Sequence, residues 1–262
     1  MDVMQRNWTA RFGFALSVMT SLLAAPSSAQ EITERSAEYR YQLDFHVPDA
    51  ALARFLPAGW VADIAEAGNA KDANLRLIFI DRVTVRDAAG DPVGSGSELL
   101  VHLAIPVKEE SGSKSGQMII AGISDADTAV SGPFGVYERA TTADMERSST
   151  TMDGKVIVEE NWSFASASGE QYQLHIRYER GPARIGGGDT TFYNPSDPSQ
   201  SVVFRRDQGI DIARNVTTSP PDHVLDFSYS AGGGRIADLF DGTERALSWD
   251  SFPWYNLEII AQ

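Results

Sequence analysis

The stretch that decides the fold is residues 39–47, which read Tyr-Arg-Tyr-Gln-Leu-Asp-Phe-His-Val. Large apolar side chains stand at every odd position and polar side chains at every even position. Because successive side chains of a β-strand point to opposite faces, this alternation predicts a strand with one buried face. Strand patterns of this kind dominate the rest of the chain as well.

Further strands are predicted on the C-terminal side of this stretch, with turn signals between them. Asp153-Gly154 is a hairpin signal, and residues 166–169, Ser-Ala-Ser-Gly, join the next pair of strands. Many antiparallel strands and few helices predict a mainly β fold that is antiparallel and barrel-like. The predicted strands are 75–80, 83–86, 98–107, 117–123, 136–140, 156–164, 172–180, 202–204, 224–229, 235–240 and 257–260.

Three segments depart from the strand pattern. Residues 48–56 predict a helix, since Pro48 fits the first turn and Asp49 complements the positive end of the helix dipole. Residues 207–213 predict a second, short helix. Residues 182–200 are rich in Gly, Pro, Ser and Asp, and we interpret them as a long surface loop within one domain rather than a linker.

The first thirty residues have the layout of a secretory signal. Arg6 and Arg11 precede an apolar run at 12–25, and Ser27 and Ala29 place small residues at positions −3 and −1 of a cut after Ala29. The apolar run is shorter than the roughly 20 residues that a membrane-spanning helix needs. We therefore favour a cleaved signal over the alternative, an uncleaved membrane anchor.

This interpretation divides the chain into a signal peptide, residues 1–29, and a single β domain, residues 30–262, that is periplasmic or secreted. No second apolar run is long enough to span a bilayer, so membrane insertion of the mature chain is not expected. The net charge of −14 argues against binding to nucleic acid, which depends on Lys and Arg displacing counterions from phosphates. Nothing in the sequence indicates an oligomeric state.

The chain contains no cysteine, which excludes disulfides, zinc–thiolate sites and cysteine nucleophiles. It also lacks a spaced ligand cluster such as His-Glu-x-x-His, so we predict neither a metal nor a cofactor. A small molecule is the expected ligand or substrate, because the remaining polar residues of interest lie on predicted strands rich in apolar side chains.

Three stretches together resemble one family. Residues 41–60 (Tyr-Gln-Leu-Asp-Phe-His-Val-Pro-Asp-Ala-Ala-Leu-Ala-Arg-Phe-Leu-Pro-Ala-Gly-Trp), 97–107 (Ser-Glu-Leu-Leu-Val-His-Leu-Ala-Ile-Pro-Val) and 125–140 (Asp-Ala-Asp-Thr-Ala-Val-Ser-Gly-Pro-Phe-Gly-Val-Tyr-Glu-Arg-Ala) resemble, in this order, segments of acetoacetate decarboxylase-like proteins. The resemblance implies a double-barrel-like β fold with a buried pocket. In active members it implies a lysine that forms a Schiff base with a keto acid, assisted by a glutamate and an arginine.

The resemblance places the catalytic lysine near Glu138 or Arg139, and neither side chain can form an imine. A Schiff-base lysine must be desolvated or placed beside another cation to lose its proton near neutral pH. The four lysines of this chain stand among polar or acidic neighbours, so we expect all of them to be solvated. We predict a divergent member that lacks the Schiff-base lysine. The four are Lys71, Lys108, Lys114 and Lys155.

Glu98 and His102 are the first candidate site residues. They are four apart on a predicted strand, so they share a face and could act as acid and base. The resemblance also matches the family's glutamate to Glu98. The alternative is a polar residue at a strand end and a histidine satisfied by its neighbours.

Arg40 is the candidate for binding a substrate carboxylate, since a guanidinium can hold a carboxylate by two parallel hydrogen bonds. It lies on the polar face of the first strand, two residues after Glu38, where the resemblance places the family's pocket arginine. The alternative is a surface arginine paired with a nearby acid. Tyr137 and Arg139, in the segment that carries the family's lysine, are the remaining candidates for substrate binding.

Three functions stay open from the sequence. The first is an exported enzyme of lyase type (aldolase, dehydratase or hydratase) that uses Glu98 and Arg40 on a keto acid or related carboxylate. The second is a non-catalytic periplasmic binding protein for an apolar or carboxylated metabolite. The third is a structural envelope protein. A buried Glu98 within hydrogen-bond reach of Arg40 or Tyr137 would favour chemistry.

Overall fold

The computed structural model describes residues 31–126, 132–216 and 222–262, so the predicted signal peptide lies outside the described residues. The described chain is mostly β, as predicted, with one α-helix and two short 3-10 helices. Its elements are β1 (Ile32–His46), α1 (Asp49–Ala53), β2 (Trp60–Ala62), β3 (Leu75–Asp87), β4 (Glu98–Glu109), β5 (Ser115–Ser124), η1 (Pro133–Gly135), β6 (Glu138–Met152), β7 (Lys155–Ser166), β8 (Gln171–Glu179), β9 (Arg184–Tyr193), β10 (Ser201–Asn215), β11 (Val224–Gly232), η2 (Gly234–Ile236) and β12 (Arg245–Ala261).

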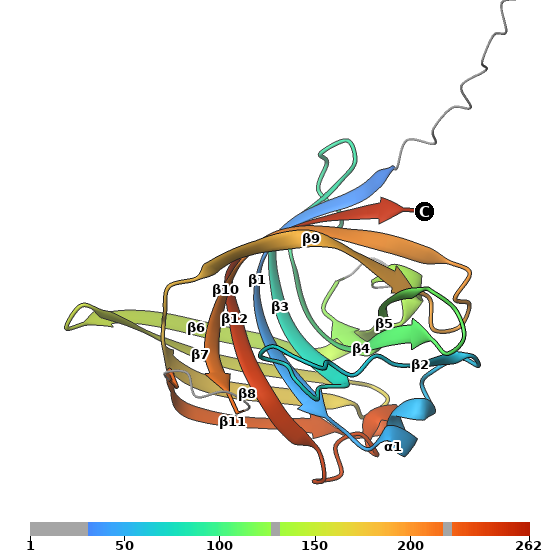
Figure 1. Ribbon diagram of the computed structural model, residues 1–262. Helices are drawn as coiled ribbons and strands as arrows, with labels where there is room; N and C mark the ends of the chain where they lie inside the picture. Colours follow the sequence, from blue (N-terminus) through green and yellow to red (C-terminus); the bar gives the residue numbers. More distant parts are fainter. Residues whose placement is uncertain (1–30, 127–131, 217–221) are drawn as a thin grey trace, which may run out of the picture.

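The strand pairings form a barrel-like circuit. The order β5-β9-β10-β12-β1-β3-β4 returns to β5, because β5 pairs with β4 as well as with β9. All of these pairings are antiparallel except the short contact between β5 and β9, which is parallel. In Figure 1 the strands β10, β12, β1 and β3 run side by side and curve together. The predicted barrel-like β fold is thus confirmed.

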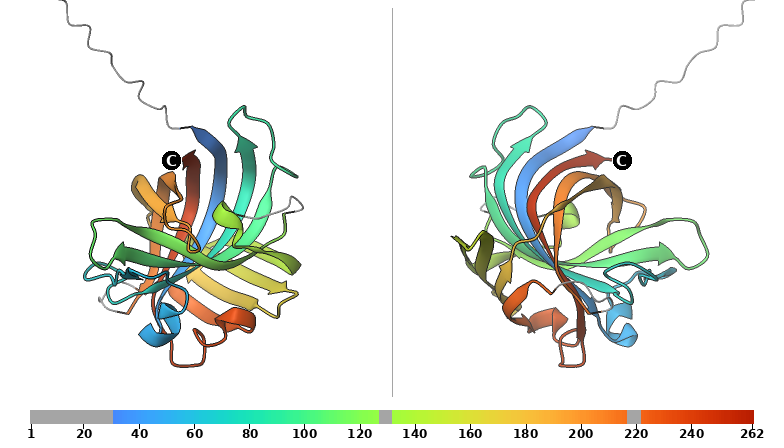
Figure 2. Two further views of the ribbon diagram at one scale, coloured as in Figure 1. Left: turned by 90° about the vertical axis from the view of Figure 1, so that its right-hand side faces the viewer. Right: turned by 60° about the vertical axis from the view of Figure 1, so that its left-hand side comes forward.

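A second, antiparallel group of strands lies beside this circuit. Its order is β6-β7-β8-β11, and a short parallel pairing of β5 with β6 connects it to the circuit. Figures 1 and 2 show the long hairpin of β6 and β7 extending away from the circuit. The turn of this hairpin is at Asp153 and Gly154, as the sequence predicted, and Met152 pairs with Lys155 across it. We refer to these four strands as the second sheet.

The main hydrophobic core fills the space between the second sheet and the strands β1, β3 and β4. Phe79 of β3 lies with its ring centroid 5.8 Å from Trp162 and 6.2 Å from Phe164, both on β7. Tyr41 of β1 lies 6.1 Å from Tyr178 of β8. These residues belong to one cluster of buried side chains, so the apolar face of residues 39–47 packs inward from Tyr41 onward, whereas Tyr39 is 40% exposed.

The polar face of the same strand is buried too. Arg40, Gln42 and Asp44 point away from the second sheet and line cavities inside the circuit, and Asp44 is only 1% exposed. A smaller cluster of buried apolar residues, including Phe204 and Tyr255, lies on this inner side. The strands of the circuit therefore separate an apolar core on one side from a polar interior on the other.

Three local predictions were wrong. Residues 182–200 contain the strand β9, in which Gly186, Gly187 and Gly188 pair with β10. The predicted helix at 207–213 is part of β10, since pairing with β9 and β12 on both sides outweighs local propensity. The predicted strand at 235–240 contains the 3-10 helix η2 instead.

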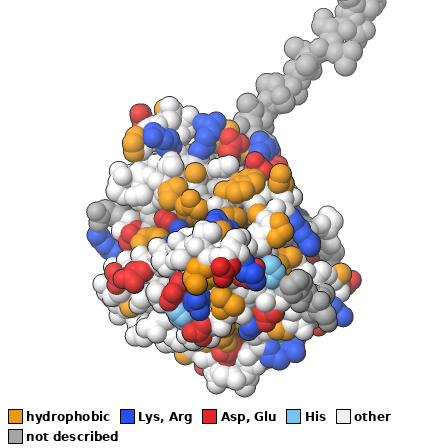
Figure 3. Space-filling model, turned by 90° about the vertical axis from the view of Figure 1, so that its left-hand side faces the viewer, with side chains coloured by type: hydrophobic (Ala, Val, Ile, Leu, Met, Phe, Trp, Pro, Cys, Tyr) orange, Lys and Arg blue, Asp and Glu red, His pale blue; other side chains and the backbone are white. Residues whose placement is uncertain are grey.

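The surface mixes charges of both signs with apolar side chains. Figure 3 shows acidic and basic side chains interspersed over one face of the molecule. In the described part of the chain, no helix has the length and apolar character needed to cross a membrane.

Candidate functional site

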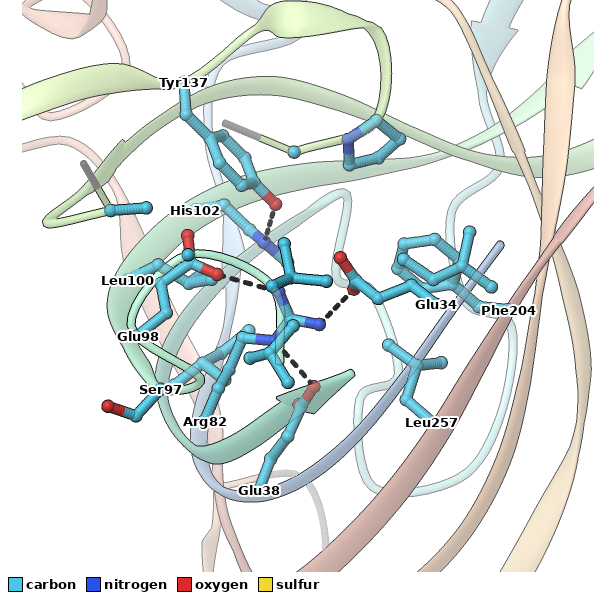
Figure 4. Close-up of a pocket in the computed structure, with 18 of the residues that line it drawn as sticks. Glu34, Glu38, Arg82, Ser97, Glu98, Leu100, His102, Tyr137, Phe204 and Leu257 are labelled. Carbon is cyan, nitrogen blue, oxygen red and sulfur yellow. Dashed lines mark hydrogen bonds and ion pairs between the residues drawn. The ribbon is translucent and has the colours of Figure 1, made fainter. Parts of the chain in front are cut away.

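The candidate site is a cavity of about 390 Å³ at one end of the interior of the circuit. We call it the first cavity. Polar side chains reach it from β1, β3 and β4, and the segment 132–137 covers it from the side of β5 (Figure 4). Apolar residues of β10 and β12, among them Phe204 and Leu257, complete the wall. The cavity therefore combines an apolar side with a concentrated set of charged groups.

Arg82 lies at the centre of these charges and contacts three glutamates (Figure 4). Its strand β3 runs between β1 and β4, and Arg82 stands directly opposite Glu38 on one side and Glu98 on the other. Its NH1 donates to Glu98 Oε2 at 2.7 Å and its Nε donates to Glu38 Oε1 at 3.2 Å. Its NH2 donates to Glu34. All three nitrogens of this guanidinium are thus used by carboxylates.

Glu38 is held in its charged form although its side chain is completely buried. Burial alone would raise its pKa, but the charges of Arg40 and Arg82 outweigh burial and lower it. Burial would lower the pKa of Arg82, but the charges of Glu38, Glu34 and Glu98 outweigh burial and raise it. Ser36 donates a further hydrogen bond to Glu38. In this cluster of three carboxylates and two guanidiniums each charge has an oppositely charged partner, which is how buried charges are normally tolerated.

Arg40 has a different environment from Arg82. Its Nε donates to Glu38 Oε2 at 2.5 Å, and its guanidinium carbon lies 3.7 Å from the centre of the Tyr255 ring. Stacking of a guanidinium on an aromatic ring is a favourable cation–π contact. Among the described residues, no hydrogen bond uses NH1 or NH2 of Arg40. These two nitrogens remain for a ligand.

Tyr137 and His102 form a neutral pair on the wall of the first cavity. The Tyr137 hydroxyl lies 2.8 Å from Nδ1 of His102. Burial, followed by the charge of Arg40, lowers the pKa of His102 to about 3, so the imidazole is neutral at physiological pH. Burial, followed by the charge of Glu98, raises the pKa of Tyr137, so the phenol keeps its proton. Within the described ranges, Nε2 of His102 is buried without a hydrogen-bond partner.

Two glycines make room for the Tyr137 ring. A Cβ added at Gly122 of β5 would lie 2.6 Å from the ring, and one added at Gly132 would lie 2.4 Å from it. Gly132 also has φ of +77°, which other residues rarely adopt. The ring is therefore fixed between two backbone segments, and its hydroxyl is aimed at His102.

The structure brings four of the five predicted site residues to the first cavity. Arg40, Glu98, His102 and Tyr137 all line it, whereas Arg139 is exposed on β6 and is not part of the wall. Of the three residues at 137–139 only Tyr137 lines the cavity, since it precedes β6, which begins at Glu138, and its direction is not set by the alternation of that strand. Glu98 accepts hydrogen bonds from Arg82 and from Ser124. Its arginine partner is therefore Arg82 of β3 and not Arg40 of β1.

Sequence reasoning missed Arg82, the centre of the charge network. The sequence prediction ended one strand at residue 80 and began another at 83, yet residues 75–87 form one continuous strand. A charged pair, Asp81 and Arg82, interrupts the apolar pattern there. The interruption was itself the signal, because a charge in the middle of a buried strand requires partners on neighbouring strands.

The four lysines of the chain all lie in described residues and all are on the surface. Lys71 is exposed. The other three form ion pairs with acids: Lys108 with Asp63 at 2.9 Å, Lys114 with Glu109 at 3.8 Å and Lys155 with Glu179 at 2.8 Å. Their side chains are 49–60% exposed. Each lysine amine is thus hydrated, as the sequence predicted.

The aromatic run at 249–255 forms part of β12. It lies between β1 and β10, with Trp249 in the main core and Phe252 and Tyr255 on the inner side of the circuit. Over the ranges that the structure describes, no group of three or more His, Asp or Glu side chains is arranged to hold a metal ion.

Comparisons with known proteins were made by sequence and by structure. No family model matches the chain, and no curated protein matches its sequence. An acetoacetate decarboxylase-like enzyme from Sphingomonas wittichii RW1 is similar in structure, with a TM-score of 0.51 at 11% identity over 89% of this chain and 92% of that one. The enduracididine biosynthesis enzyme MppR with HEPES buffer bound has a TM-score of 0.50 at 10% identity, covering 97% of this chain and 96% of that one. A second MppR structure, complexed with the condensation product of pyruvate and imidazole 4-carboxaldehyde, has a TM-score of 0.50 at 12% identity over 95% of this chain and 96% of that one. At such identities the likeness concerns the fold, and the chain has the fold of the acetoacetate decarboxylase-like enzymes.

Proposed function

We propose that this chain is an exported protein that binds a small carboxylate, with a keto acid as the favoured class, inside the circuit of strands. The observation that carries the proposal is the state of Arg40. Its two terminal nitrogens have no hydrogen-bond partner in the described part of the chain, and its guanidinium is held over Tyr255 at 3.7 Å. A fixed guanidinium with two free donors matches a carboxylate in geometry and charge.

The other charged groups of the first cavity favour the same assignment. Arg82 is fully used by Glu34, Glu38 and Glu98, so it orients the cluster and has no donor left for a ligand. Arg40 gives only Nε to Glu38. Arg82 therefore serves as the partner of the buried acids, and Arg40 has the donors that face the ligand.

The keto-acid class is supported by the ligand of a structural neighbour and by Tyr137. One MppR structure contains a condensation product of pyruvate. In the present chain the Tyr137 phenol keeps its proton and lies beside the cavity, where it can donate a hydrogen bond to a carbonyl oxygen. A donor to the carboxylate and a donor to the carbonyl oxygen together recognise the two adjacent polar groups of a 2-keto acid.

Lyase-type turnover is the second candidate, and the Tyr137–His102 pair favours it. A positioned phenol can stabilise the negative charge that develops on a carbonyl oxygen when a neighbouring carbon loses a proton. Against this, burial makes His102 a weak base, and Glu98 is already bound by Arg82 and Ser124. The first cavity therefore supports ligand recognition more strongly than acid–base chemistry.

A Schiff base is not part of the proposed function, because each lysine amine of this chain is hydrated and three are paired with acids. Acidic neighbours stabilise the ammonium form, which is not nucleophilic. Treatment with borohydride in the presence of pyruvate or acetoacetate is expected to leave the mass of the protein unchanged. A stable adduct on any lysine would overturn this part of the proposal.

Calorimetric titration with pyruvate and acetoacetate tests the binding function. Removing the charged donors in Arg40→Gln is expected to weaken binding by about tenfold or more, which corresponds to roughly 1.5–3 kcal/mol for a hydrogen bond to a charged group. Arg40→Lys keeps the charge and should retain part of the affinity. Arg35→Gln, on the outer side of β1, is the matched control and should bind like the wild type. Equal affinity of wild type and Arg40→Gln would refute the proposal.

Export is tested separately. Cell fractionation is expected to recover the protein outside the cytoplasm, and N-terminal sequencing of the recovered chain should begin at Gln30. A chain recovered with its first residues intact in the cytoplasm would contradict export without affecting the binding site.

A further inference from the structure

A second cavity lies beside the first within the circuit. Its volume is about 360 Å³, and it shares Arg40, His102 and Phe204 with the first cavity. Its walls come from β1, β3, β4, β5, β9, β10 and β12 and from the segment 65–70. Because Arg40 lines both cavities, a ligand held at Arg40 can extend into either of them.

One cation of the second cavity has no acidic partner. Arg76 forms an ion pair with Asp44 at 3.2 Å, and Arg40 is paired with Glu38. Arg206, by contrast, donates a hydrogen bond to the hydroxyl of Thr190 and forms no ion pair with any described residue. An arginine that is half-buried in a cavity without a counter-ion is a site for an anionic group of a ligand.

The strand pattern of β10 directs Arg206 inward. Phe204, Arg206 and Gln208 all line the second cavity, in agreement with the alternation of side chains along a strand. The neighbouring Arg205 points outward, is exposed, and pairs with Asp189 at 3.2 Å. Two consecutive arginines on one strand thus have opposite surroundings, one with a carboxylate and one without.

Tyr255 lies on β12, between the strands that carry Arg40 and Arg206. The guanidinium of Arg40 stacks on its ring, and Gln208, two residues from Arg206, stands directly opposite it in the pairing of β10 with β12. Burial raises the pKa of Tyr255, and the charges of Arg40 and Arg206 both oppose that rise. Arg40 on β1 and Arg206 on β10 therefore line one cavity from the two strands that flank β12, which carries Tyr255.

We propose that the second cavity is a specificity subsite in which Arg206 binds the far carboxylate of a dicarboxylate whose near carboxylate is held by Arg40. The inference rests on the proposed function and narrows its substrate class from carboxylates to dicarboxylates. Gln42, Gln117 and Gln208 on the same wall offer amide groups to the chain between the two carboxylates. Arg76 is neutralised by Asp44, so it adds little to the attraction.

Calorimetric titration with matched keto acids tests the subsite. The probes are oxaloacetate, 2-oxoglutarate and 2-oxoadipate, with 2-oxopentanoate as the monocarboxylate that has the chain length of 2-oxoglutarate. The best dicarboxylate is expected to bind the wild type about tenfold or more tightly than 2-oxopentanoate, as for one additional charged pair. Arg206→Gln should remove this advantage and leave the affinity for 2-oxopentanoate unchanged.

Arg205→Gln is the matched control, because it removes the adjacent arginine on the opposite face of the same strand. It should keep the preference for the dicarboxylate. Arg206→Lys retains the charge and should keep part of the preference, so the test remains valid if Arg206→Gln lowers the melting temperature. Wild type without a dicarboxylate preference, or an Arg206→Gln variant that retains it, would overturn the inference. Inorganic phosphate competing as well as the best dicarboxylate would also overturn it, since the subsite would then accept any anion.

The results separate this inference from the proposed function. If Arg40→Gln leaves the binding of 2-oxopentanoate unchanged, carboxylate binding at Arg40 is wrong, whatever Arg206 does. If Arg40→Gln abolishes that binding while Arg206→Gln has no effect on the dicarboxylate preference, the proposed function stands and the subsite is wrong.

Discussion

Both faces of β1 are buried, but against different surroundings. On one face Tyr41, Leu43 and Phe45 are fully buried against the second sheet. On the other face Arg40 and Asp44 are almost as inaccessible, at 9% and 1% exposed, yet they carry charges. An alternating pattern usually separates a buried face from a solvated face. In β1 the alternation separates a face in the apolar core from a face in the polar interior of the circuit.

Burial has different requirements on the two faces. An apolar side chain needs only close packing, and its contribution grows with the area withdrawn from water. A buried charge needs a partner at hydrogen-bond distance, because an isolated ion loses its hydration. The inner face meets this requirement with pairs such as Arg82 with Glu38 and Arg76 with Asp44. Arg40 and Arg206 stand out because each keeps donors that are not used in this way.

The largest loss of stability is expected from a substitution at Arg82, inside the circuit of strands. Arg82→Leu leaves Glu34, Glu38 and Glu98 without their common counter-ion, and Glu38 is completely buried. Removing one partner of a buried ion pair costs about 3–5 kcal/mol, and with three acids affected we expect a loss near 5 kcal/mol in the free energy of unfolding. Denaturant unfolding measures it. Arg35→Leu, which breaks a surface pair with Glu258, is the control and should cost less than about 1 kcal/mol.

The second-largest loss of stability is expected at Phe79, on the face of β3 that packs against the second sheet. Phe79→Ala removes a fully buried ring that contacts Trp162 and Phe164, and a loss of about 4 kcal/mol is expected from the cavity it leaves. Val83→Ala, on the same strand at an exposed position, should change the free energy of unfolding by less than about 0.5 kcal/mol. Similar losses at both positions would mean that the core between the sheets is not the source of stability. Ligand affinity of the folded Phe79→Ala protein should match that of the wild type.

A pH-dependent effect comes from Asp250, which lines the second cavity. Burial and the charge of Asp44 raise the pKa of Asp250 to about 7 from 3.8. Between these values the folded chain binds the proton more tightly than the unfolded chain, so stability falls as pH rises from about 4 to about 7. Asp250→Asn removes this penalty and is expected to raise the free energy of unfolding at pH 8 by about 2–4 kcal/mol.

Denaturant unfolding of both proteins between pH 4 and pH 8 measures the Asp250 effect. The gain from Asp250→Asn should grow with pH and be close to zero near pH 4. A gain that is the same at every pH would show that the exchange acts through packing or hydrogen bonding, not through the charge on the inner face.

The smallest effect is expected at Tyr137. Tyr137→Phe keeps the ring between Gly122 and Gly132 but removes the hydroxyl that contacts His102. One neutral hydrogen bond contributes about 1 kcal/mol to stability, so the melting temperature should fall only slightly. Keto-acid binding should weaken by a similar amount if the phenol contacts the carbonyl. Unchanged binding of pyruvate to Tyr137→Phe would remove the carbonyl donor from the proposed site.

The sequence predicted much of the strand architecture because side-chain alternation is local. The strands around 39–47, 98–107 and 156–164 and the hairpin at Asp153-Gly154 follow from adjacent residues alone. Alternation failed where glycine-rich or charged segments are held as strands by their neighbours. β9, with three consecutive glycines, is a strand because β10 supplies its hydrogen-bond partners.

Site residues could be predicted where their position on a single strand was informative. They could not be predicted where the outcome depended on how several strands pair. Glu98, His102 and Arg40 stand on polar positions of strands, and the structure places all three at the first cavity. Arg139 was predicted with them but is exposed on β6, whereas Tyr137 lies in the segment before β6 and lines the cavity. Which position of that segment points inward depends on where pairing with β5 begins.

By itself the sequence determined the strand content, the exposure of the lysine amines and the absence of thiol chemistry, since these depend on residue type and immediate neighbours. Only the tertiary structure decided which charges neutralise one another. Arg82 meets Glu38 and Glu98 because β3 lies between β1 and β4, and Arg40 and Arg206 line one cavity because β1 and β10 flank β12. Electrostatic pairing depends on distances in space, and the pairing of distant strands sets those distances.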